Sequence, residues 1–274
     1  MGKYIFATDV DGTLLNDQGE VHPETIEAFK KAQEQGSYTV IATGRAVIRT
    51  KPLLNKIPYV DFLVCNNGSA VYDVKKDKII YLAGVNPNHY PTILDFARQH
   101  HVTFKLHTDL DWIGDAENKN EKPTPLTSEL DQKIRSFIQE NPHSATLFNG
   151  QTPTQLSING SEEFCKKYFQ QFQDWFGKDS SVYLTNSIYL DVNPKNKSKW
   201  TGLLELAKIL HIDENHIVTF GDSYNDLEML LNAKDNGYPL ANSKIELLEH
   251  IPAKIGSNNT NAIAKKILEY LQKE

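Results

Sequence analysis

The stretch from Lys3 to Thr13 reads Lys-Tyr-Ile-Phe-Ala-Thr-Asp-Val-Asp-Gly-Thr. Its first six residues form a short, mostly apolar run, which is typical of a buried strand. Asp9 and Asp11 end this run, and Gly12 allows a tight turn directly after them. Residues i and i+2 of an extended segment point the same way. We therefore expect the carboxylates of Asp9 and Asp11 to converge on one substrate atom.

The segments that follow alternate between strand and helix. Pro23 suits the first position of a helix and Gly36 is placed to end it. Apolar runs at 38–42 and 62–65 predict two more strands, with a helix between them that reaches about residue 57. The same alternation returns near the end of the sequence, where we expect a helix, a strand and two further helices at 203–210, 217–220, 225–231 and 262–271. This order predicts an α/β fold with a doubly wound, Rossmann-like parallel sheet.

The middle of the sequence has a different pattern. Helical segments begin near Ser128 and Ser161, and they separate strand-like runs at 102–108, 145–148, 155–158 and 182–184. We interpret this part as an inserted α+β domain. The expected division is a core of residues 1–82 and 187–274 and an inserted domain of residues 83–186, with hinges near 82–86 and 186–190.

The composition indicates a folded chain and limits its partners. Of the 274 residues, 39% are hydrophobic and 23% are charged, without low-complexity tracts. The formal net charge is −6 and the basic residues are scattered, which argues against a nucleic-acid partner. No run approaches the ~20 apolar residues of a membrane helix, and no signal peptide is apparent. Cys65 and Cys165 need not pair. We expect a cytoplasmic protein that binds neither nucleic acid nor membrane.

Polar residues follow several of the predicted strands. Ligands of a doubly wound sheet bind beyond the carboxyl ends of its strands. The polar stretches found there are Asp9-Val10-Asp11, Thr43-Gly44, Asn66-Asn67-Gly68 and Gly221-Asp222-Ser223-Tyr224-Asn225-Asp226. Asp222 and Asp226 would add hard oxygen ligands to those near Asp9. Because Mg²⁺ binds through a few carboxylates, substrate phosphate and water, we predict a magnesium site here.

A group of carboxylates would repel an anionic substrate unless a fixed cation compensated for them. Lys199, just before a predicted helix, is the best-placed candidate, and Lys195 and Lys197 are rivals on composition alone. The Thr43 side chain and the Gly44 amide would hold phosphate oxygens. Positioning and charge neutralisation would then supply most of the catalysis, as phosphoryl transfer generally requires.

Four stretches of the sequence resemble, in order, the four motifs of the haloacid dehalogenase superfamily. They are Asp-Val-Asp-Gly-Thr-Leu at 9–14, Ala-Thr-Gly-Arg at 42–45, Lys199, and Gly-Asp-Ser-Tyr-Asn-Asp at 221–226. The insertion between the second and third motifs resembles the large-cap, Cof-type branch of sugar-phosphate phosphatases. Asn67-Gly68 and Leu240-Ala241-Asn242 are also similar to that branch. Trp200 differs from it, because glycine commonly follows the lysine of the third motif.

The resemblance implies a role for each residue. Asp9 would be the nucleophile, and Asp11 the general acid and then the general base. Magnesium would be held by the carboxylates of Asp9 and Asp222 and the carbonyl of Asp11, with Asp226 in support. The groups expected around the phosphate are the Val10 amide, Thr43, Gly44, Lys199 and Asn225. Arg45 and Asn67 are candidate substrate contacts.

These features predict a Mg²⁺-dependent phosphatase that acts on small phosphorylated metabolites, sugar phosphates first, through an aspartyl-phosphate intermediate. A phosphomutase and a non-catalytic sugar-phosphate sensor are the alternatives, and the oligomeric state stays open. In the cap, Lys105, His107 and Asp109 alternate on one strand face, with Trp112 after them. Such a face points either to substrate or to solvent, and solvent is the commoner case.

Overall fold

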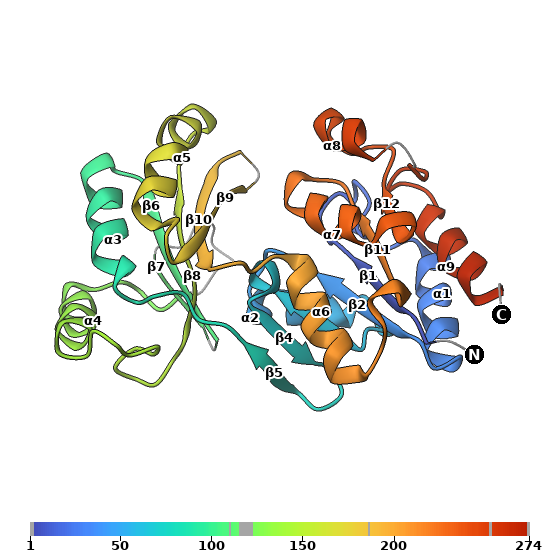
Figure 1. The fold of residues 1–274 in the computed structure, drawn as a ribbon, viewed down its shortest axis with the longest axis horizontal. Helices are drawn as coiled ribbons and strands as arrows, with labels where there is room; N and C mark the ends of the chain where they lie inside the picture. The colour runs from blue at the N-terminus through green and yellow to red at the C-terminus, as the bar shows by residue number, and fades with distance from the viewer. Residues whose placement is uncertain (1–2, 110, 115–122, 186, 252–253, 273–274) are drawn as a thin grey trace. The chain divides into compact units, whose positions relative to one another are not determined.

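A computed structural model describes residues 3–109, 111–114, 123–185, 187–251 and 254–272 (Figure 1). The chain divides into two compact units. We call Met1–Tyr81 with Ser198–Glu274 the core unit, and Leu82–Lys197 the inserted unit.

The core unit is built on a seven-stranded sheet with the order β12-β11-β1-β2-β3-β4-β5. The strands are β1 (Ile5–Thr8), β2 (Tyr38–Ala42), β3 (Phe62–Cys65), β4 (Ala70–Asp73), β5 (Lys78–Leu82), β11 (Ile217–Gly221) and β12 (Gly237–Pro239). The pairs from β12 to β3 are parallel, and β3 pairs with β4 in the antiparallel sense. Every residue of β1, β3 and β11 is buried, as expected for strands covered on both faces.

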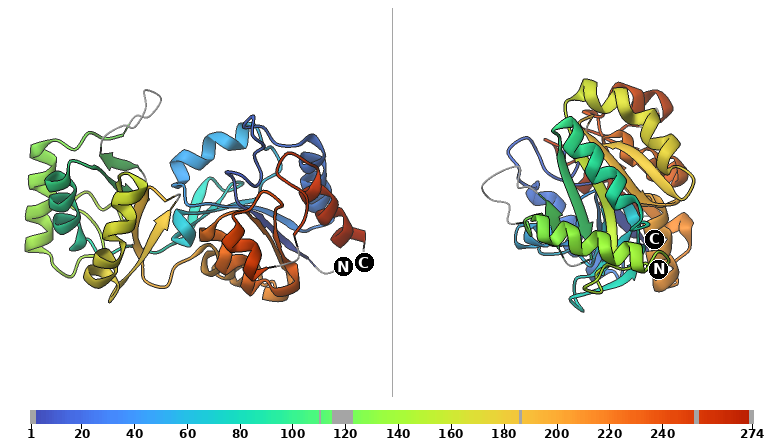
Figure 2. Two further views of the ribbon diagram at one scale, coloured as in Figure 1. Left: turned by 90° about the horizontal axis from the view of Figure 1, so that it is seen from above. Right: turned by 90° about the vertical axis from the view of Figure 1, so that its left-hand side faces the viewer.

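Helices cover both faces of this sheet. They are α1 (Pro23–Glu34), α2 (Val47–Thr50), α6 (Lys199–Leu210), α7 (Leu227–Asn232), α8 (Ile245–His250) and α9 (Ala262–Gln272). Short 3₁₀ helices lie at Lys51–Asn55, Asn66–Gly68, Glu214–His216, Tyr224–Asp226 and Lys234–Asn236. In Figures 1 and 2, α1 and α9 lie together on one side of the sheet and α6 and α7 on the other. The core unit is therefore the doubly wound α/β fold that the sequence predicts.

The inserted unit has a five-stranded antiparallel sheet with the order β7-β6-β8-β10-β9. Its strands are β6 (Thr103–Thr108), β7 (Trp112–Gly114), β8 (Pro153–Asn159), β9 (Ser180–Thr185) and β10 (Tyr189–Pro194). Its helices are α3 (His89–His100), α4 (Ser128–Glu140) and α5 (Glu162–Phe176). One face of the sheet packs on the helices through a buried cluster that includes Leu106, Leu156, Val192, Ile93, Ile134 and Phe172.

The structure differs from the sequence expectations at two places in this unit. The run Ala145–Phe148 is irregular rather than a strand. Its apolar character has another cause, since Leu147 is buried in the helix-facing core. The second boundary lies after Lys197 rather than after residue 186. The reason is β10, which pairs with both β8 and β9 and so belongs to the inserted sheet.

Two further features are the character of the helices and the state of the cysteines. Across the described ranges, none of the helices has both the length and the apolar character required to cross a bilayer. Cys65 and Cys165 are both buried and both free.

Candidate active site

The carboxyl end of β1 places Asp9 at the centre of the core sheet, between β11 and β2. The Asp9 amide continues the ladder by donating to the Phe220 carbonyl oxygen at 3.0 Å. The chain then turns at Gly12, whose φ is +81°. A Cβ at Gly12 would lie 2.5 Å from Oδ2 of Asp222, so a side chain would collide with the second acidic segment. Val10, between the two aspartates, is fully buried.

The N-terminus of α6 brings a lysine into the same place. Ser198 caps this helix by accepting from the Thr201 amide. Gly68, at the end of β3, lets α6 approach, because a Cβ there would lie 1.8 Å from the Ser198 carbonyl oxygen. The Ser198 cap and the close contact with Gly68 therefore fix the position of Lys199, the first residue of α6.

Lys199 joins two carboxylates in the interior. Its Nζ lies 2.6 Å from Oδ1 of Asp9 and 2.6 Å from Oδ1 of Asp226. Lys199, Asp9 and Asp226 are only 1%, 6% and 0% exposed. Burial alone would lower the pKa of Lys199, but the charges of Asp226 and Asp9 outweigh it and hold that pKa above its ordinary value. The lysine is therefore charged.

The carboxylates carry more negative charge than Lys199 balances. Burial raises the pKa of Asp9 to about 7, against the opposing effect of Lys199 and with added repulsion from Asp226 and Asp222. Burial also raises the pKa of Asp222 to about 6, although the Thr13 hydroxyl donates to it at 2.7 Å. Both shifts mean that ionisation of these acids is less favourable than in water, and a further cation beside them would favour it.

Three acids can hold that cation. One carboxylate oxygen each from Asp9, Asp222 and Asp226 lies within 4.8 Å of the others. Hard anionic oxygens are the ligands that Mg²⁺ prefers, and the excess negative charge supports the same conclusion. The Asp11 carboxylate is not in this group, and the family resemblance implies only the Asp11 carbonyl as a metal ligand.

Asp11 has a different partner. Its Oδ1 lies 2.6 Å from Nη2 of Arg45 and its Oδ2 3.0 Å from Nε, which makes a bidentate pair. The Arg45 and Asp11 side chains are 34% and 60% exposed. In this conformation the carboxylates of Asp9 and Asp11 point to different cations rather than to one atom.

The ends of β2 and β3 and the loop after β11 supply the remaining predicted residues. The Thr43 carbonyl accepts from the Asn67 amide at 3.2 Å, and a Cβ at Gly44 would lie 3.1 Å from Oδ1 of Asn67. The same oxygen accepts from Nδ2 of Asn225 at 3.4 Å. Nδ2 of Asn67 is buried and has no hydrogen-bond partner among the described residues. These four residues therefore lie together at the carboxyl ends of neighbouring strands.

The structure also shows supporting residues that the sequence reasoning did not assign. Nδ2 of Asn242 donates to the Gly12 carbonyl at 2.8 Å, and Oδ1 of Asn242 accepts from the Asn258 amide at 2.9 Å. Nδ2 of Asn258 in turn donates to the Leu15 carbonyl at 3.1 Å. These bonds tie the loop after β1 to segments more than 200 residues away in sequence. Lys195, a rival of Lys199, instead donates to a carbonyl of the inserted unit.

Comparison with known proteins agrees with this geometry. A model of the haloacid dehalogenase-like hydrolases matches residues 6–267. A 5-amino-6-(5-phospho-D-ribitylamino)uracil phosphatase of Bacillus subtilis is 26% identical over 94% of each chain. A pyridoxal phosphate phosphatase of Escherichia coli is 23% identical over 99% of this chain and 100% of its own.

Solved structures show the same fold. A haloacid dehalogenase-like hydrolase from B. subtilis superposes with a TM-score of 0.78 and 18% identity, covering 97% of this chain and 99% of that one. Another, from Bacteroides thetaiotaomicron, has a TM-score of 0.76 and 19% identity, covering 98% and 99%. The family model spans the core motifs and the insertion alike, and this chain belongs to the haloacid dehalogenase-like hydrolases, as an enzyme of the phosphatase type.

Proposed function

We propose that this chain hydrolyses small phosphorylated metabolites, with sugar phosphates first, through a phosphoryl-aspartate formed on Asp9, and that its metal is Mg²⁺. The observation that carries the proposal is the buried cluster in which Lys199 bridges Asp9 and Asp226 at the carboxyl end of β1. An acid held against a charged lysine, with further carboxylates near it, suits a nucleophile that must meet a phosphate dianion.

The proposed hydrolysis has two steps. Asp9 attacks phosphorus, the bond to the alcohol oxygen breaks, and Asp11 donates its proton to that oxygen. Asp11 then takes a proton from water, whose oxygen attacks phosphorus and releases Asp9 and inorganic phosphate. The carboxylates of Asp9 and Asp222 and the carbonyl of Asp11, with Asp226 in support, would hold Mg²⁺, which would supply the positive charge that the phosphate and the carboxylates require. Throughout, Lys199 keeps Asp9 in place.

The groups around the phosphate follow from the same arrangement. Thr43, the Gly44 amide, the Val10 amide and Asn225 would hold its oxygens. The unpaired Nδ2 of Asn67 supports a substrate contact at that residue. Arg45 holds Asp11 in a half-exposed ion pair, and pairs of this kind are weak. Asp11 can therefore leave Arg45 and turn towards the leaving group.

The relatives support the substrate class. The two named above act on a ribitylaminouracil phosphate and on pyridoxal phosphate, and others are named HMP-PP phosphatases. We further propose that the enzyme works in the cytoplasm, where free thiols such as its two cysteines stay reduced.

The test is phosphate release from p-nitrophenyl phosphate and from a panel of sugar and cofactor phosphates, with Mg²⁺ or EDTA. We expect Asp9→Asn to lower kcat by about 10⁴-fold or more, and EDTA to stop wild-type turnover. Asp235→Asn, at an exposed position, is the control and should keep wild-type activity. Isomerised sugar phosphate without free phosphate would indicate a mutase, and binding without turnover would indicate a sensor.

A further inference from the structure

The chain bends through three left-handed residues directly after β3. The φ angles of Asn66, Asn67 and Gly68 are +50°, +49° and +90°. Glycine adopts this conformation freely, whereas a residue with a Cβ meets steric repulsion in it, and asparagine visits it mainly as a single residue. Two consecutive left-handed asparagines therefore make this segment strained. We call residues 66–68 the left-handed turn.

Burial sets the left-handed turn apart from the other places with this conformation. Asn66 and Asn67 are 1% and 3% exposed. Among the residues that the structure describes, the other non-glycine residues with positive φ occur singly, and none of them is buried. They are Asp77, His101, Ser187, Asn196, His211 and Lys234. Backbone strain persists only where the surrounding structure enforces it, and it is common at functional sites.

Two backbone hydrogen bonds join the left-handed turn to the loop after β2. The Asn66 amide donates to the Arg45 carbonyl at 3.0 Å. The Asn67 amide donates to the Thr43 carbonyl at 3.2 Å. Successive amides of an extended strand point to opposite sides, so the change of backbone direction is what lets both amides bond to the same loop. This loop is the one that carries the proposed phosphate ligands of the second motif.

The glycine of the left-handed turn contacts the helix that begins at Lys199. A Cβ at Gly68 would lie 1.8 Å from the Ser198 carbonyl oxygen. A Cβ at Gly202 would lie 2.7 Å from the Cα of Gly68. The backbone of the turn therefore packs directly on the first turn of α6, and two segments of the candidate site enforce its conformation.

The side chain of Asn67 reaches a third segment of the site, the loop after β11. Its Oδ1 accepts from Nδ2 of Asn225 at 3.4 Å, a long bond of the kind that can shorten when a substrate binds. Oδ1 of Asn225 accepts from the Ser223 hydroxyl at 2.6 Å. The Asn225 amide is thus held at both ends. Because an amide nitrogen carries two N–H groups, one of them bonds to Asn67 and the other is left for a phosphate oxygen.

We propose that Asn67 is a positioning residue, whose Oδ1 orients the Asn225 amide towards the phosphate, and that the strained turn serves to hold Oδ1 there. The proposal deepens the proposed function and rests on it, because Asn225 is a phosphate ligand in that function. This role of Oδ1 is separate from the substrate contact proposed for Nδ2. Asn66 has the same backbone conformation, but Nδ2 of its side chain has no partner within the described ranges. Asn66 is therefore the matched control.

The inserted unit has buried polar side chains as well, but no such strain accompanies them. Lys105 and His107 are 2% and 7% exposed. Of the two arrangements that the sequence left open, solvent exposure of this strand face is therefore wrong. Both residues lie on β6, which is extended, and the described non-glycine residues of this unit with positive φ are not buried. Burial of polar groups alone does not make a segment comparable to the left-handed turn.

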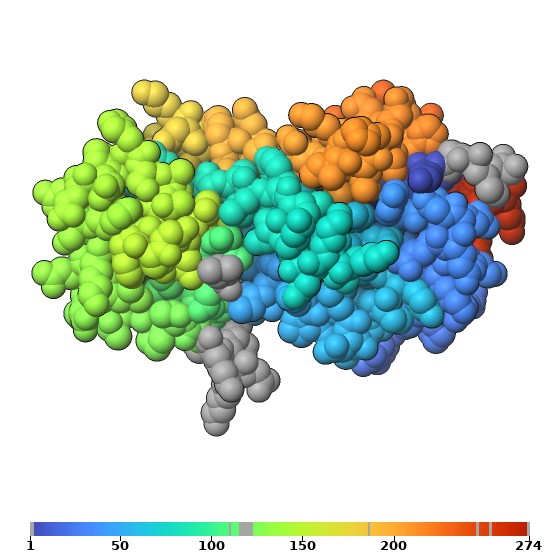
Figure 3. Space-filling model, turned by 90° about the horizontal axis from the view of Figure 1, so that it is seen from below, coloured from blue at the N-terminus to red at the C-terminus, as the bar shows by residue number. Residues whose placement is uncertain are grey.

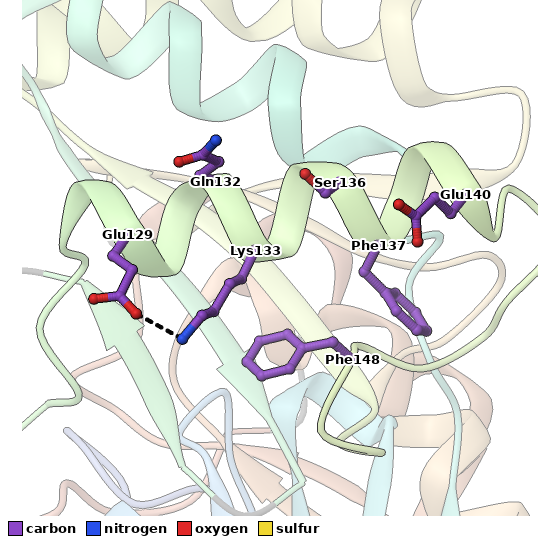
Figure 4. Close-up of a pocket in the computed structure, with 7 residues that line it drawn as sticks. All are labelled: Glu129, Gln132, Lys133, Ser136, Phe137, Glu140 and Phe148. Atoms are coloured by element: carbon purple, nitrogen blue, oxygen red, sulfur yellow. Dashed lines mark hydrogen bonds and ion pairs between the residues drawn. The ribbon is translucent and has the colours of Figure 1, made fainter.

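A hollow along α4 provides a second contrast (Figure 4; α4 is also visible at the surface in Figure 3). It is lined by Glu129, Lys133, Phe137 and Phe148, among others. Lys133 is already paired with Glu129 at 2.7 Å, and Phe148 is 41% exposed. The described residues there leave no buried polar atom without a partner, and they indicate no ligand.

The first test separates strain from function. Asn66→Gly and Asn67→Gly each remove one left-handed Cβ, so each should leave Tm unchanged or raise it by up to about 4 °C without ligand. Only Asn67→Gly removes the bond to Asn225. It should lower kcat/KM for p-nitrophenyl phosphate by about tenfold or more, whereas Asn66→Gly should stay within twofold. Equal losses of activity in the two variants, or no loss in Asn67→Gly, would overturn the proposal.

The second test asks whether Asn67 acts through Asn225. Glycine keeps the backbone bonds of the turn, so a double-mutant cycle of Asn67→Gly with Asn225→Ala reports on the side chains. Residues that act independently have losses in kcat/KM that multiply. If Asn67 positions Asn225, the double variant should lose less than this product, by about fivefold or more. A loss equal to the product would overturn the positioning role, since Asn67 would then act without Asn225.

Binding of inorganic phosphate separates this proposal from the proposed function. Calorimetry with inorganic phosphate and Mg²⁺ needs no turnover, and the same four proteins of the cycle can be compared by the Kd of phosphate. If wild type releases no phosphate from any substrate, the proposed function fails, and the Kd values still test the positioning role. If wild type is active but Asn67→Gly matches it in both kcat/KM and Kd, the positioning role fails and the proposed function stands.

Discussion

The core unit and the inserted unit each contain an ion cluster around a buried carboxylate, and the two have opposite compositions. In the core unit one lysine lies between two carboxylates, those of Asp9 and Asp226. In the inserted unit one carboxylate, that of Asp131, lies between two arginines at 2.6 and 2.7 Å. These arginines are Arg98 and Arg135.

The two clusters shift carboxyl pKa values in opposite directions. Burial raises the pKa of Asp9 to about 7 despite the nearby lysine. Burial also acts to raise the pKa of Asp131, but hydrogen bonds from Arg135 and Arg98 and the charge of Arg135 outweigh it and lower that pKa. Arg135 also pairs with Asp95, so this cluster is balanced. Excess buried charge, rather than burial or ion pairing alone, therefore distinguishes the candidate site from the scaffold.

Among changes that compare the two clusters, the largest expected effect comes from removing the shared cation of the core cluster. Lys199→Met should lower kcat for phosphate release by about 10²–10⁴-fold, because the nucleophile and the phosphate lose a preorganised positive charge. Arg98→Met makes the matching change in the inserted unit and should keep kcat within twofold. Steady-state kinetics on folded variants, checked by circular dichroism, measure both. Similar losses in the two variants would remove the functional distinction between the clusters.

Metal binding is the next largest effect. Mg²⁺ at about 100 times its Kd should stabilise the fold by about 2.7 kcal/mol, which is on the order of 5 °C in Tm for a chain of this size. Asp222→Asn should lose most of this gain, since it removes a ligand. Asp131→Asn should keep it. A thermal shift of equal size in Asp222→Asn would show that the cation binds elsewhere.

The stability of the metal-free protein should depend on pH with opposite signs in the two clusters. Asp9 and Asp222 have folded pKa values of about 7 and 6, above the ordinary 3.8. The stability that these two acids contribute to the fold is fully present below about pH 4 and is lost as pH rises through about 7. Asp131 has a lowered pKa, so its contribution is present above about pH 4 and is lost in acid.

Urea unfolding in EDTA measures both effects. As pH rises from 5 to 8, ionisation of the core cluster should lower the free energy of unfolding by on the order of 1–4 kcal/mol. Asp9→Asn should reduce this dependence of the free energy of unfolding on pH. Asp131→Asn should cost about 1–3 kcal/mol at pH 7 and progressively less below pH 4. An unchanged slope in Asp9→Asn would show that another group titrates.

The strands that the sequence predicted most directly are those with apolar residues along most of their length. β1, β3 and β11 are apolar throughout because both faces of the core sheet are covered, and the sequence predicts them directly. β10 alternates Leu190 and Val192 with polar residues that are also buried, so nothing in its sequence ties it to the inserted sheet. Ala145–Phe148 shows the converse error. Its apolar residues predicted a strand, but the segment is irregular and only places Leu147 in the core.

Within the candidate site, spacing predicted which acidic residues lie close together but not the partners of their side chains. Asp9, Asp222 and Asp226 follow strand ends, and the parallel sheet brings such ends together. The pairing of Asp11 with Arg45 depends on side-chain direction, which spacing does not specify. The link from Asn258 to Leu15 spans 243 residues and has no local sequence pattern.

The smallest expected effect concerns the half-exposed pair of Asp11 and Arg45. Arg45→Met should lower kcat about two- to tenfold for alkyl phosphates, because Asp11 is less well positioned to protonate a poor leaving group. It should leave p-nitrophenyl phosphate nearly unchanged, since nitrophenolate leaves without a proton. Lys51→Met is the matched control, because Lys51 forms a similarly exposed pair with Asp77 at 2.7 Å. Equal losses with both leaving groups would mean that Arg45 contacts the phosphate itself, and the distinction between the interior and the exposed cations would then no longer hold.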